Sequence, residues 1–255
     1  MRTIELNFGD SQKYFVEEAY KTLRANIQFC GTDVKAIAVT SSHPNEGKST
    51  VSMSLSKALA EAGRRVLFID ADLRKSVIMQ RYANEAGIVG LSQYLSGQNE
   101  WDEVVCATQI EGLHVVFSGQ FPANPVELLG SKAFASMIEE KTKVYDYVVV
   151  DTPPLGMVID CAVIANVCDS AVIVIASEKT SIRRANMVKD QLTKSGVHIL
   201  GVILNKVRSG RMHYHKRYGR YGTNGSYKKY EATKKTKKSK KSKKAEMTSD
   251  EVFAE

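Results

Sequence analysis

The chain has 255 residues, 43% of them hydrophobic, and its 36 Lys/Arg against 28 Asp/Glu give a formal net charge of +8 at pH 7. No apolar run reaches the roughly 18 residues that a membrane-spanning helix needs, because Asp151, Asp160 and Asp169 interrupt the most hydrophobic stretch. The amino-terminal sequence MRTIELNFGD lacks the apolar segment of a secretory signal, so we expect a cytoplasmic protein. The cysteines match neither a disulfide scaffold nor a paired zinc motif, and we expect buried thiols. They are Cys30, Cys106, Cys161 and Cys168.

The positive charge is concentrated at the carboxyl-terminal end. Residues 208–255 contain 15 Lys/Arg and five Asp/Glu, a net charge of +10, whereas residues 1–207 contain 21 and 23, a net charge of −2. A body of about 200 residues is long enough to bury one core. The extension is rich in Gly, Lys and Tyr without apolar periodicity, which favours disorder. We therefore expect a folded domain over residues 1–207 and a solvated, basic tail.

Residues 11–29 predict an amphipathic helix, because apolar residues recur at a spacing of four. These residues are Phe15, Ala19, Leu23 and Ile27. From residue 35 onward, short runs rich in Val and Ile read as strands that are buried on both faces. The runs are 35–41, 65–70, 113–118, 145–151, 170–176 and 198–205.

The segments between these runs, such as 51–63 and 181–196, have the length and period of crossover helices. Repeated strand–helix–strand units predict an α/β domain with a mainly parallel sheet flanked by helices. In such a sheet, ligands bind beyond the carboxyl ends of the strands.

A phosphate-binding loop follows the first predicted strand. Residues 42–50 match the pattern G-x-x-x-x-G-K-[ST], with Ser42 in place of the first glycine. Gly47 lets the backbone approach the phosphates, Lys48 reaches the β- and γ-phosphates, and the Ser49 hydroxyl ligates Mg²⁺. The expected phosphate-binding residues are Ser42, Asn45, Glu46, Gly47, Lys48, Ser49 and Thr50.

Acidic residues end two further predicted strands. Asp70 closes the run 65–70 and Asp72 follows it by two residues, and Asp151 closes the run 145–151. One of the three carboxylates can hold Mg²⁺ and another can act as a base. Asn205, at the end of the last strand, is the expected purine contact. Because Arg208 stands where a guanine reader would carry Asp, we expect ATP as the nucleotide.

Five of the 11 tyrosines lie within 17 residues of the tail. They serve either as phosphoacceptors or as aromatic platforms for single-stranded nucleic acid, and a nearby nucleotide site favours phosphoacceptors. These tyrosines are Tyr214, Tyr218, Tyr221, Tyr227 and Tyr230. The lysine run within 231–255 is read as a solvated extension, or as a segment attracted to an anionic membrane leaflet or an acidic partner. We expect no specific nucleic acid, since no folded reading surface accompanies it.

The order SSHPNEGKS, FIDADLR and VVVDTPP over residues 41–154, followed by a tyrosine cluster, resembles the bacterial tyrosine kinases, and the resemblance covers residues 14–230. The helical motif Glu-x-x-Arg-x-x-Arg of that family corresponds here to Glu18, Lys21 and Arg24, with lysine in the first arginine position. The segment GQFPANPVELL, residues 119–129, is similar to another loop of the family.

The resemblance implies a P-loop NTPase-like kinase domain over residues 1–207 that uses ATP and Mg²⁺ and autophosphorylates its tail in trans. It assigns phosphate binding to Lys48, Mg²⁺ to Ser49, Asp72 and Asp151, and activation of the tyrosine hydroxyl to Asp70. It also implies a role in capsule or exopolysaccharide biosynthesis, and recruitment to the inner membrane face by the cytoplasmic tail of a membrane-anchored activator. The implied partners include a ring-shaped homo-oligomer, a cognate tyrosine phosphatase and protein tyrosine substrates.

Two alternatives remain open from the residues. A ParA- or MinD-like partitioning ATPase shares the fold, but it carries a lysine where this chain has His43, and it gives no reason for the tyrosine cluster. A polyanion-binding module with a degenerate nucleotide site explains the tail but not the three aspartates.

Overall fold

The computed structural model describes residues 1–9, 14–83, 85 and 87–207. The tyrosine cluster at 208–230 and the lysine-rich segment at 231–255 lie outside these residues, so their disorder and their roles stay predictions. Among the described helices, none has both the length and the apolar character needed to cross a bilayer.

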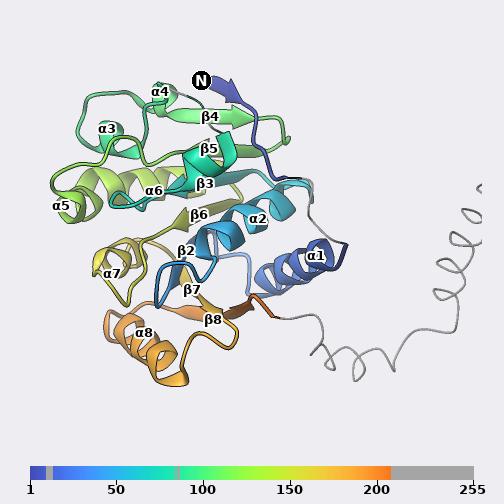
Figure 1. Cartoon of the computed structure of the whole chain (residues 1–255). Coiled ribbons are helices and arrows are strands. Elements are labelled where there is room, and N and C mark those ends of the chain that lie inside the picture. Colours follow the sequence, from blue (N-terminus) through green and yellow to red (C-terminus); the bar gives the residue numbers. More distant parts are fainter. Residues whose placement is uncertain (10–13, 84, 86, 208–255) are drawn as a thin grey trace, which may run out of the picture. The chain divides into compact units, whose positions relative to one another are not determined.

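An eight-stranded sheet runs through the described residues in the order β1-β4-β5-β3-β6-β2-β7-β8 (Figure 1). The six predicted strands are confirmed, and the pairings among them are parallel. Burial on both faces was wrong for β8, because it ends the strand order and its Val202 and Leu204 are exposed. Two strands that were not predicted, β1 and β4, extend the sheet beyond β5, and β4 pairs antiparallel with β5. The strands are β1 Arg2–Ile4, β2 Ala36–Ser41, β3 Val66–Asp70, β4 Val105–Thr108, β5 Leu113–Val116, β6 Tyr147–Asp151, β7 Ser170–Ala176 and β8 Ile199–Asn205.

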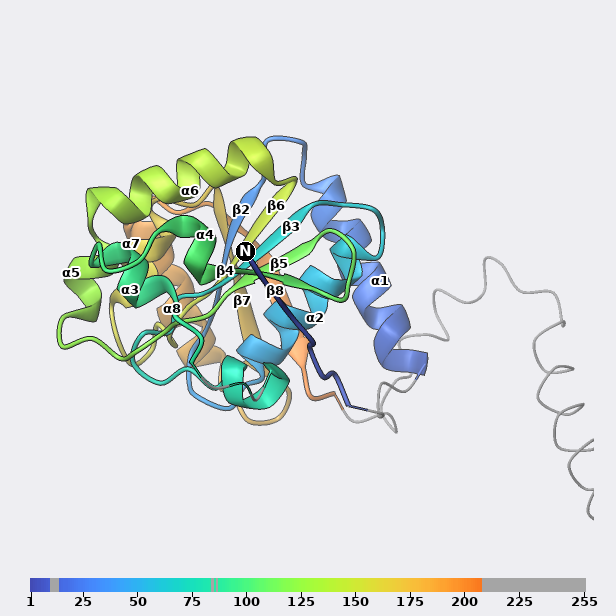
Figure 2. The ribbon, with the colours of Figure 1, turned by 90° about the horizontal axis from the view of Figure 1, so that it is seen from above.

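Helices cover both faces of the sheet. Figure 2 shows α6, α7 and α8 on one side of the strands and α1 and α2 on the other. This arrangement confirms the predicted α/β fold. The helices are α1 Tyr14–Phe29, α2 Lys48–Ala60, the π-helix η1 Met79–Ala83, α3 Leu91–Leu95, α4 Trp101–Val104, α5 Pro125–Leu129, α6 Lys132–Val144, α7 Asp160–Ala165 and α8 Ile182–Lys194.

The central strands are buried on both faces, which explains why they read as continuous apolar runs. In β2, Ala38 packs with the α6–α8 side and Ile37 with the α1–α2 side. In β3, Ile69 packs on the α6–α8 side and Phe68 on the α1–α2 side. All four side chains are fully buried. Two packed layers therefore stabilise the strands whose ends carry the polar residues.

The buried face of α1 differs from the predicted stripe. Ile27 is buried and Leu23 is partly buried, but Ala19 is exposed. Tyr20 takes its place in the cluster that packs against α2. The spacing 20, 23 and 27 is the ordinary three-then-four pattern of a helix face, so the strict spacing of four was wrong at Ala19.

The cysteines are not uniformly buried. Cys106 and Cys161 are buried and Cys168 is partly buried, but Cys30 is exposed. Cys30 follows the last turn of α1, beyond the last buried residue Ile27. The expectation of four buried thiols was therefore wrong for Cys30.

One side chain adds to the pairing of β1 with β4 by holding the residue that follows the strand. Gln109 follows β4, and its amide bonds both backbone groups of Leu6: Leu6 N–H donates to Oε1 at 2.9 Å, and Nε2 donates to the Leu6 carbonyl at 2.6 Å. Leu6 itself is buried. This double contact extends the attachment of the amino-terminal segment beyond the three paired residues of β1.

We predict that Gln109→Ala lowers the free energy of unfolding by about 1–2 kcal/mol, because two backbone groups of a buried residue lose their partner. Urea denaturation followed by circular dichroism measures this change. Gln98→Ala, at an exposed turn, is the matched control and should change stability little. Equal stability of the two variants would contradict the role of Gln109.

Candidate active site

The loop between β2 and α2 has the backbone of a phosphate cradle. Gly47 precedes α2 in the left-handed region, with φ of 91°. A Cβ on Gly47 would lie 2.1 Å from Asn205 Nδ2. Both the backbone angle and the close approach therefore require glycine here. The N–H groups of the first α2 turn face the ligand side of such a loop.

The Glu46 carboxylate organises the loop from inside. It is buried and accepts hydrogen bonds from the backbone N–H of Ser42 at 2.7 Å and of His43 at 2.9 Å. The hydroxyls of Ser42 and Thr180 also donate to it. Because Thr180 follows β7, Glu46 joins the phosphate loop to a neighbouring strand connection. Thr180 was not among the predicted site residues.

The end of β8 holds the same loop from outside. Asn205 Nδ2 donates to the Glu46 carbonyl at 2.9 Å, and Lys206 Nζ donates to the Asn45 carbonyl. Asn45 has a left-handed backbone, with φ of 65°. Asn205 thus lies beside the nucleotide loop, where a purine contact was predicted, and it also has a structural task.

A buried ion pair joins the loop to β6. Lys48 Nζ lies 2.7 Å from Asp151 Oδ2, and both side chains are almost completely buried. The Ser52 hydroxyl donates to the other Asp151 oxygen at 2.6 Å. Lys48 Nζ is also 3.1 Å from Ser49 Oγ. The predicted site residues Lys48, Ser49 and Asp151 therefore lie in contact with one another.

Asp70 and Asp72 extend this cluster along the neighbouring strand. Burial, together with the negative charge of Asp151, raises the pKa of Asp70 from its ordinary 3.8 to about 7. The Ser76 hydroxyl donates to Asp70 Oδ2. Burial also raises the pKa of Asp72, against the lowering effect of Lys48. Asp70 therefore combines full burial with a pKa close to neutral pH, as a general base requires.

Two contacts tie the segment after β3 to its surroundings. Arg74 forms a two-point contact with Asp160, with Nε–Oδ2 of 2.7 Å and Nη2–Oδ1 of 3.1 Å. Asp160 is fully buried at the start of α7. Arg81 in η1 donates to Thr50 Oγ1 at 2.8 Å. Asp160 was not predicted as a site residue. Its position as an aspartate within an otherwise apolar run was the signal that could have identified it.

The three α1 residues of the predicted oligomer motif make contacts within this chain. Glu18 and Lys21 form an exposed ion pair of 2.8 Å. Arg24 Nη1 donates to the Ala58 carbonyl of α2 at 3.0 Å. Their role in an oligomer stays a prediction.

The cluster fits a Mg²⁺ ion that is held together with phosphates. In residues 1–9, 14–83, 85 and 87–207, no three His, Cys, Asp or Glu side chains lie close enough to form a metal cage. Mg²⁺ keeps several waters and needs only one or two carboxylates beside the phosphates. Asp72 and Asp151 interact electrostatically across Lys48, and Ser49 lies beside Lys48. These donors match that chemistry.

Comparison with known proteins places the chain in a family. A family model described as an AAA domain matches residues 34–195. Tyrosine-protein kinase CpsD of Streptococcus agalactiae serotype III (strain NEM316) is 42% identical over 198 residues, which cover 78% of this chain and 85% of that protein. This chain belongs to the bacterial tyrosine-protein kinase family. The kinase domain of Escherichia coli tyrosine kinase ETK has a TM-score of 0.73 and 32% identity, over 83% of this chain and 80% of that one.

The relation to partitioning ATPases is weaker. The septum site-determining protein MinD from Pyrococcus horikoshii OT3, solved in complex with Mg-ADP, has a TM-score of 0.58 and 26% identity. The match covers 70% of this chain and 72% of MinD. The P-loop NTPase-like architecture is therefore common to both, and nucleotide binding follows from it.

We predict that Gly156→Ala disturbs the phosphate loop. A Cβ on Gly156 would lie 2.1 Å from the Ser42 carbonyl oxygen, which is backbone and must shift. The shift misaligns the backbone groups that would contact the phosphates, so we expect affinity for a fluorescent ATP analogue to fall about tenfold or more. Gly201→Ala is the control, because its Cβ meets open space. Equal ATP-analogue affinities of Gly156→Ala and Gly201→Ala would contradict a role of Gly156 in shaping the phosphate loop.

We predict a pH dependence of stability that Asp70 carries. Its folded pKa, about 7, lies above the ordinary 3.8, so the folded state binds more protons between pH 4 and 7. Its contribution to stability is therefore fully present below about pH 4 and is lost as pH rises, by up to about 1.4 kcal/mol per pH unit. Asp70→Asn should gain stability relative to wild type at pH 8 more than at pH 5. Urea unfolding measures both values, and exposed Asp102→Asn is the control.

Proposed function

We propose that this bacterial tyrosine kinase transfers the γ-phosphoryl group of ATP to tyrosines of the segment 214–230 in a second copy of the chain. The relatives named CpsD support the further proposal that this reaction regulates capsule or exopolysaccharide synthesis. A membrane-anchored activator would recruit the kinase to the inner face of the membrane. A tyrosine phosphatase would remove the phosphate from the modified tyrosines. The observation that carries the kinase proposal is the convergence of Lys48, Asp70, Asp72 and Asp151 at one edge of the sheet.

Each residue has a task in this proposal. The loop N–H groups and Lys48 bind the β- and γ-phosphates, so Lys48 exchanges Asp151 for the nucleotide. Ser49, Asp72 and Asp151 hold Mg²⁺, which neutralises charge on the phosphates when it is bound. Asp70 accepts the proton of the tyrosine hydroxyl.

The transfer balances with these groups alone. The tyrosine oxygen forms a bond to the γ-phosphorus, the bond from that phosphorus to the bridging oxygen breaks, and ADP leaves. The hydroxyl proton passes to the Asp70 carboxylate, whose pKa of about 7 lets it accept a proton near neutral pH and release it afterwards.

The partitioning alternative predicts phosphate release without phosphotyrosine. Glu46, Asn205 and the phosphate loop serve both reactions equally, because they hold the nucleotide rather than the acceptor. A phosphotyrosine assay therefore separates the two functions, whereas nucleotide binding does not.

We predict that Lys48→Met lowers tail phosphorylation at least about 100-fold, because the variant loses the cation that stabilises charge on the transferred group. The test incubates purified full chain with labelled ATP and Mg²⁺ and then maps phosphotyrosine. Lys189→Met, an exposed substitution on α8, should retain wild-type activity. Unchanged phosphorylation in Lys48→Met, or phosphate release without phosphotyrosine in wild type, would refute the kinase proposal.

A further inference from the structure

Ser52 places a hydroxyl against the buried carboxylate of Asp151. It lies one turn after Lys48 on α2, and it is fully buried. Its Oγ is 2.6 Å from Asp151 Oδ1 and 2.8 Å from the Lys48 carbonyl oxygen. Ser52 was not among the predicted site residues. Because Asp151 is a proposed Mg²⁺ ligand, the way in which Ser52 holds this carboxylate bears on the reaction.

The single hydrogen of this hydroxyl goes to Asp151. A serine hydroxyl has one O–H and donates to one acceptor at a time. The Lys48 carbonyl already accepts the Ser52 N–H within the helix, whereas Asp151 Oδ1 is a charged acceptor and forms the stronger bond. The 2.6 Å separation is in the range of an O–H group that donates to a carboxylate. Ser52 is therefore a directed donor to one particular oxygen of Asp151.

Separate partners hold the backbone and the two oxygens of Asp151. It ends β6, where it pairs with Val39 of β2 and Asp70 of β3, so its backbone is fixed from both sides. Lys48 Nζ lies 2.7 Å from Oδ2, and Ser52 holds Oδ1. The side chain therefore keeps its orientation through one cation and one hydroxyl.

The proposed reaction removes the cation from this arrangement. Lys48 Nζ contacts Asp151 Oδ2 and also lies 3.1 Å from Ser49 Oγ, so one cation already lies between two predicted Mg²⁺ ligands. When Lys48 turns to the nucleotide phosphates, Oδ2 loses its partner. Ser52 still holds Oδ1, and Oδ2 therefore continues to face the phosphate loop.

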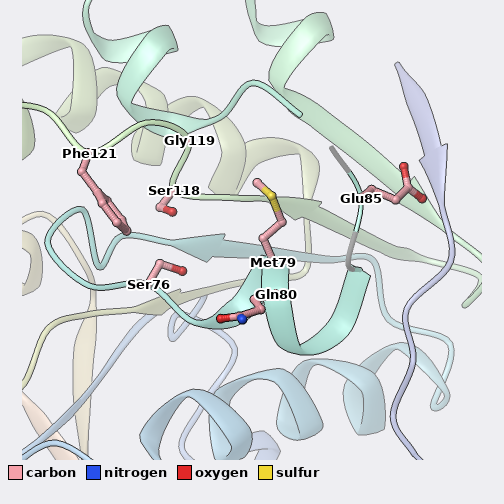
Figure 3. Close-up of a pocket in the computed structure, with 7 residues that line it drawn as sticks. All are labelled: Ser76, Met79, Gln80, Glu85, Ser118, Gly119 and Phe121. Carbon is pink, nitrogen blue, oxygen red and sulfur yellow. The ribbon is translucent and has the colours of Figure 1, made fainter. Parts of the chain in front are cut away.

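Water cannot take over this task. Asp70 has a comparable partner, because the Ser76 hydroxyl donates to it. Ser76 is only partly buried and lines a groove of about 390 Å³ together with Met79 and Phe121 (Figure 3), so water can reach it. Ser52 has no exposed surface, and a water fits only where a site is roomy as well as polar. Loss of the Ser52 hydroxyl therefore leaves an Asp151 oxygen without its donor.

We propose that Ser52 is a positioning residue for Mg²⁺-dependent nucleotide binding, which holds Asp151 Oδ2 towards the phosphate loop after Lys48 has changed partners. This inference rests on the proposed kinase function, in which Ser49 and Asp151 hold Mg²⁺. Ser52 itself contacts neither nucleotide, metal nor tyrosine in this scheme. Hydrogen bonds that orient a metal ligand typically change metal affinity 10–100-fold.

Ser56 provides a matched control on the same helix. It is as buried as Ser52, and its hydroxyl donates to the Ser52 carbonyl at 2.8 Å. This bond returns a serine hydroxyl to its own helix. Ser52→Ala and Ser56→Ala thus remove the same atom, one at the carboxylate and one a full turn further along α2. Alanine is the best helix former, so we expect both variants to fold.

The test separates metal-dependent from metal-independent binding. Full-length wild type, Ser52→Ala and Ser56→Ala are titrated with MgCl₂ in the presence of a fluorescent, non-hydrolysable ATP analogue. Affinity for the analogue is also measured in EDTA. In Ser52→Ala, the Mg²⁺ concentration for half-maximal binding should rise about 10–100-fold, with affinity in EDTA within about twofold of wild type. Ser56→Ala should match wild type in both measurements.

A merely structural role of Ser52 gives a different result. Displacement of α2 would weaken analogue binding equally with Mg²⁺ and with EDTA, and this outcome would overturn the positioning role. Equal half-maximal Mg²⁺ concentrations for Ser52→Ala and Ser56→Ala would overturn it as well.

The kinase function fails or stands by a separate readout. Wild type that binds the analogue in a Mg²⁺-dependent manner but forms no phosphotyrosine from ATP would overturn the proposed function, while the role of Ser52 in nucleotide binding stands. Wild type whose analogue binding does not respond to Mg²⁺ would overturn the role of Ser52, whatever its kinase activity.

Discussion

The site is organised by the need to bury opposite charges together. Lys48 and Asp151 come from elements far apart in the chain, and neither charge is tolerable in the sheet core without the other. Ser52 satisfies the remaining Asp151 oxygen. This contact fixes α2 against β6 and places the phosphate loop at the carboxyl edge of the sheet. In the proposed function, Lys48 exchanges its ion pair with Asp151 for contacts with the nucleotide phosphates.

The same electrostatics separates the tasks of the aspartates. Asp151 is compensated by Lys48, whereas Asp70 is fully buried and has a hydroxyl as its side-chain partner. Its pKa is therefore raised towards neutrality. Asp72 lies further out and is partly exposed. The three aspartates lie at or just beyond the ends of the adjacent strands β3 and β6, yet each has a different environment. This difference supports one general base and two metal ligands in the proposed reaction.

The sequence predicted the features that depend on local pattern. Runs of Val and Ile marked the buried strands, and the residues 42–50 marked the phosphate loop, because each follows from spacing along the chain. Features that depend on distant contacts were missed. Nothing local links Arg74 to Asp160, Glu46 to Thr180 or Gln109 to Leu6. The strands β1 and β4 have three and four residues, too few to show a period. Burial of Ala19 was wrongly predicted, because a strict spacing of four residues departs from the 3.6-residue repeat of a helix.

The support that β8 gives to the phosphate loop has a consequence for synthesis of the protein. Asn205 and Lys206 hold the carbonyl groups of Glu46 and Asn45, more than 150 residues earlier in the chain. A ribosome makes the loop early, but its clamp emerges only with the last strand. A nascent chain therefore has an unfinished nucleotide site until residue 206 is free to pair.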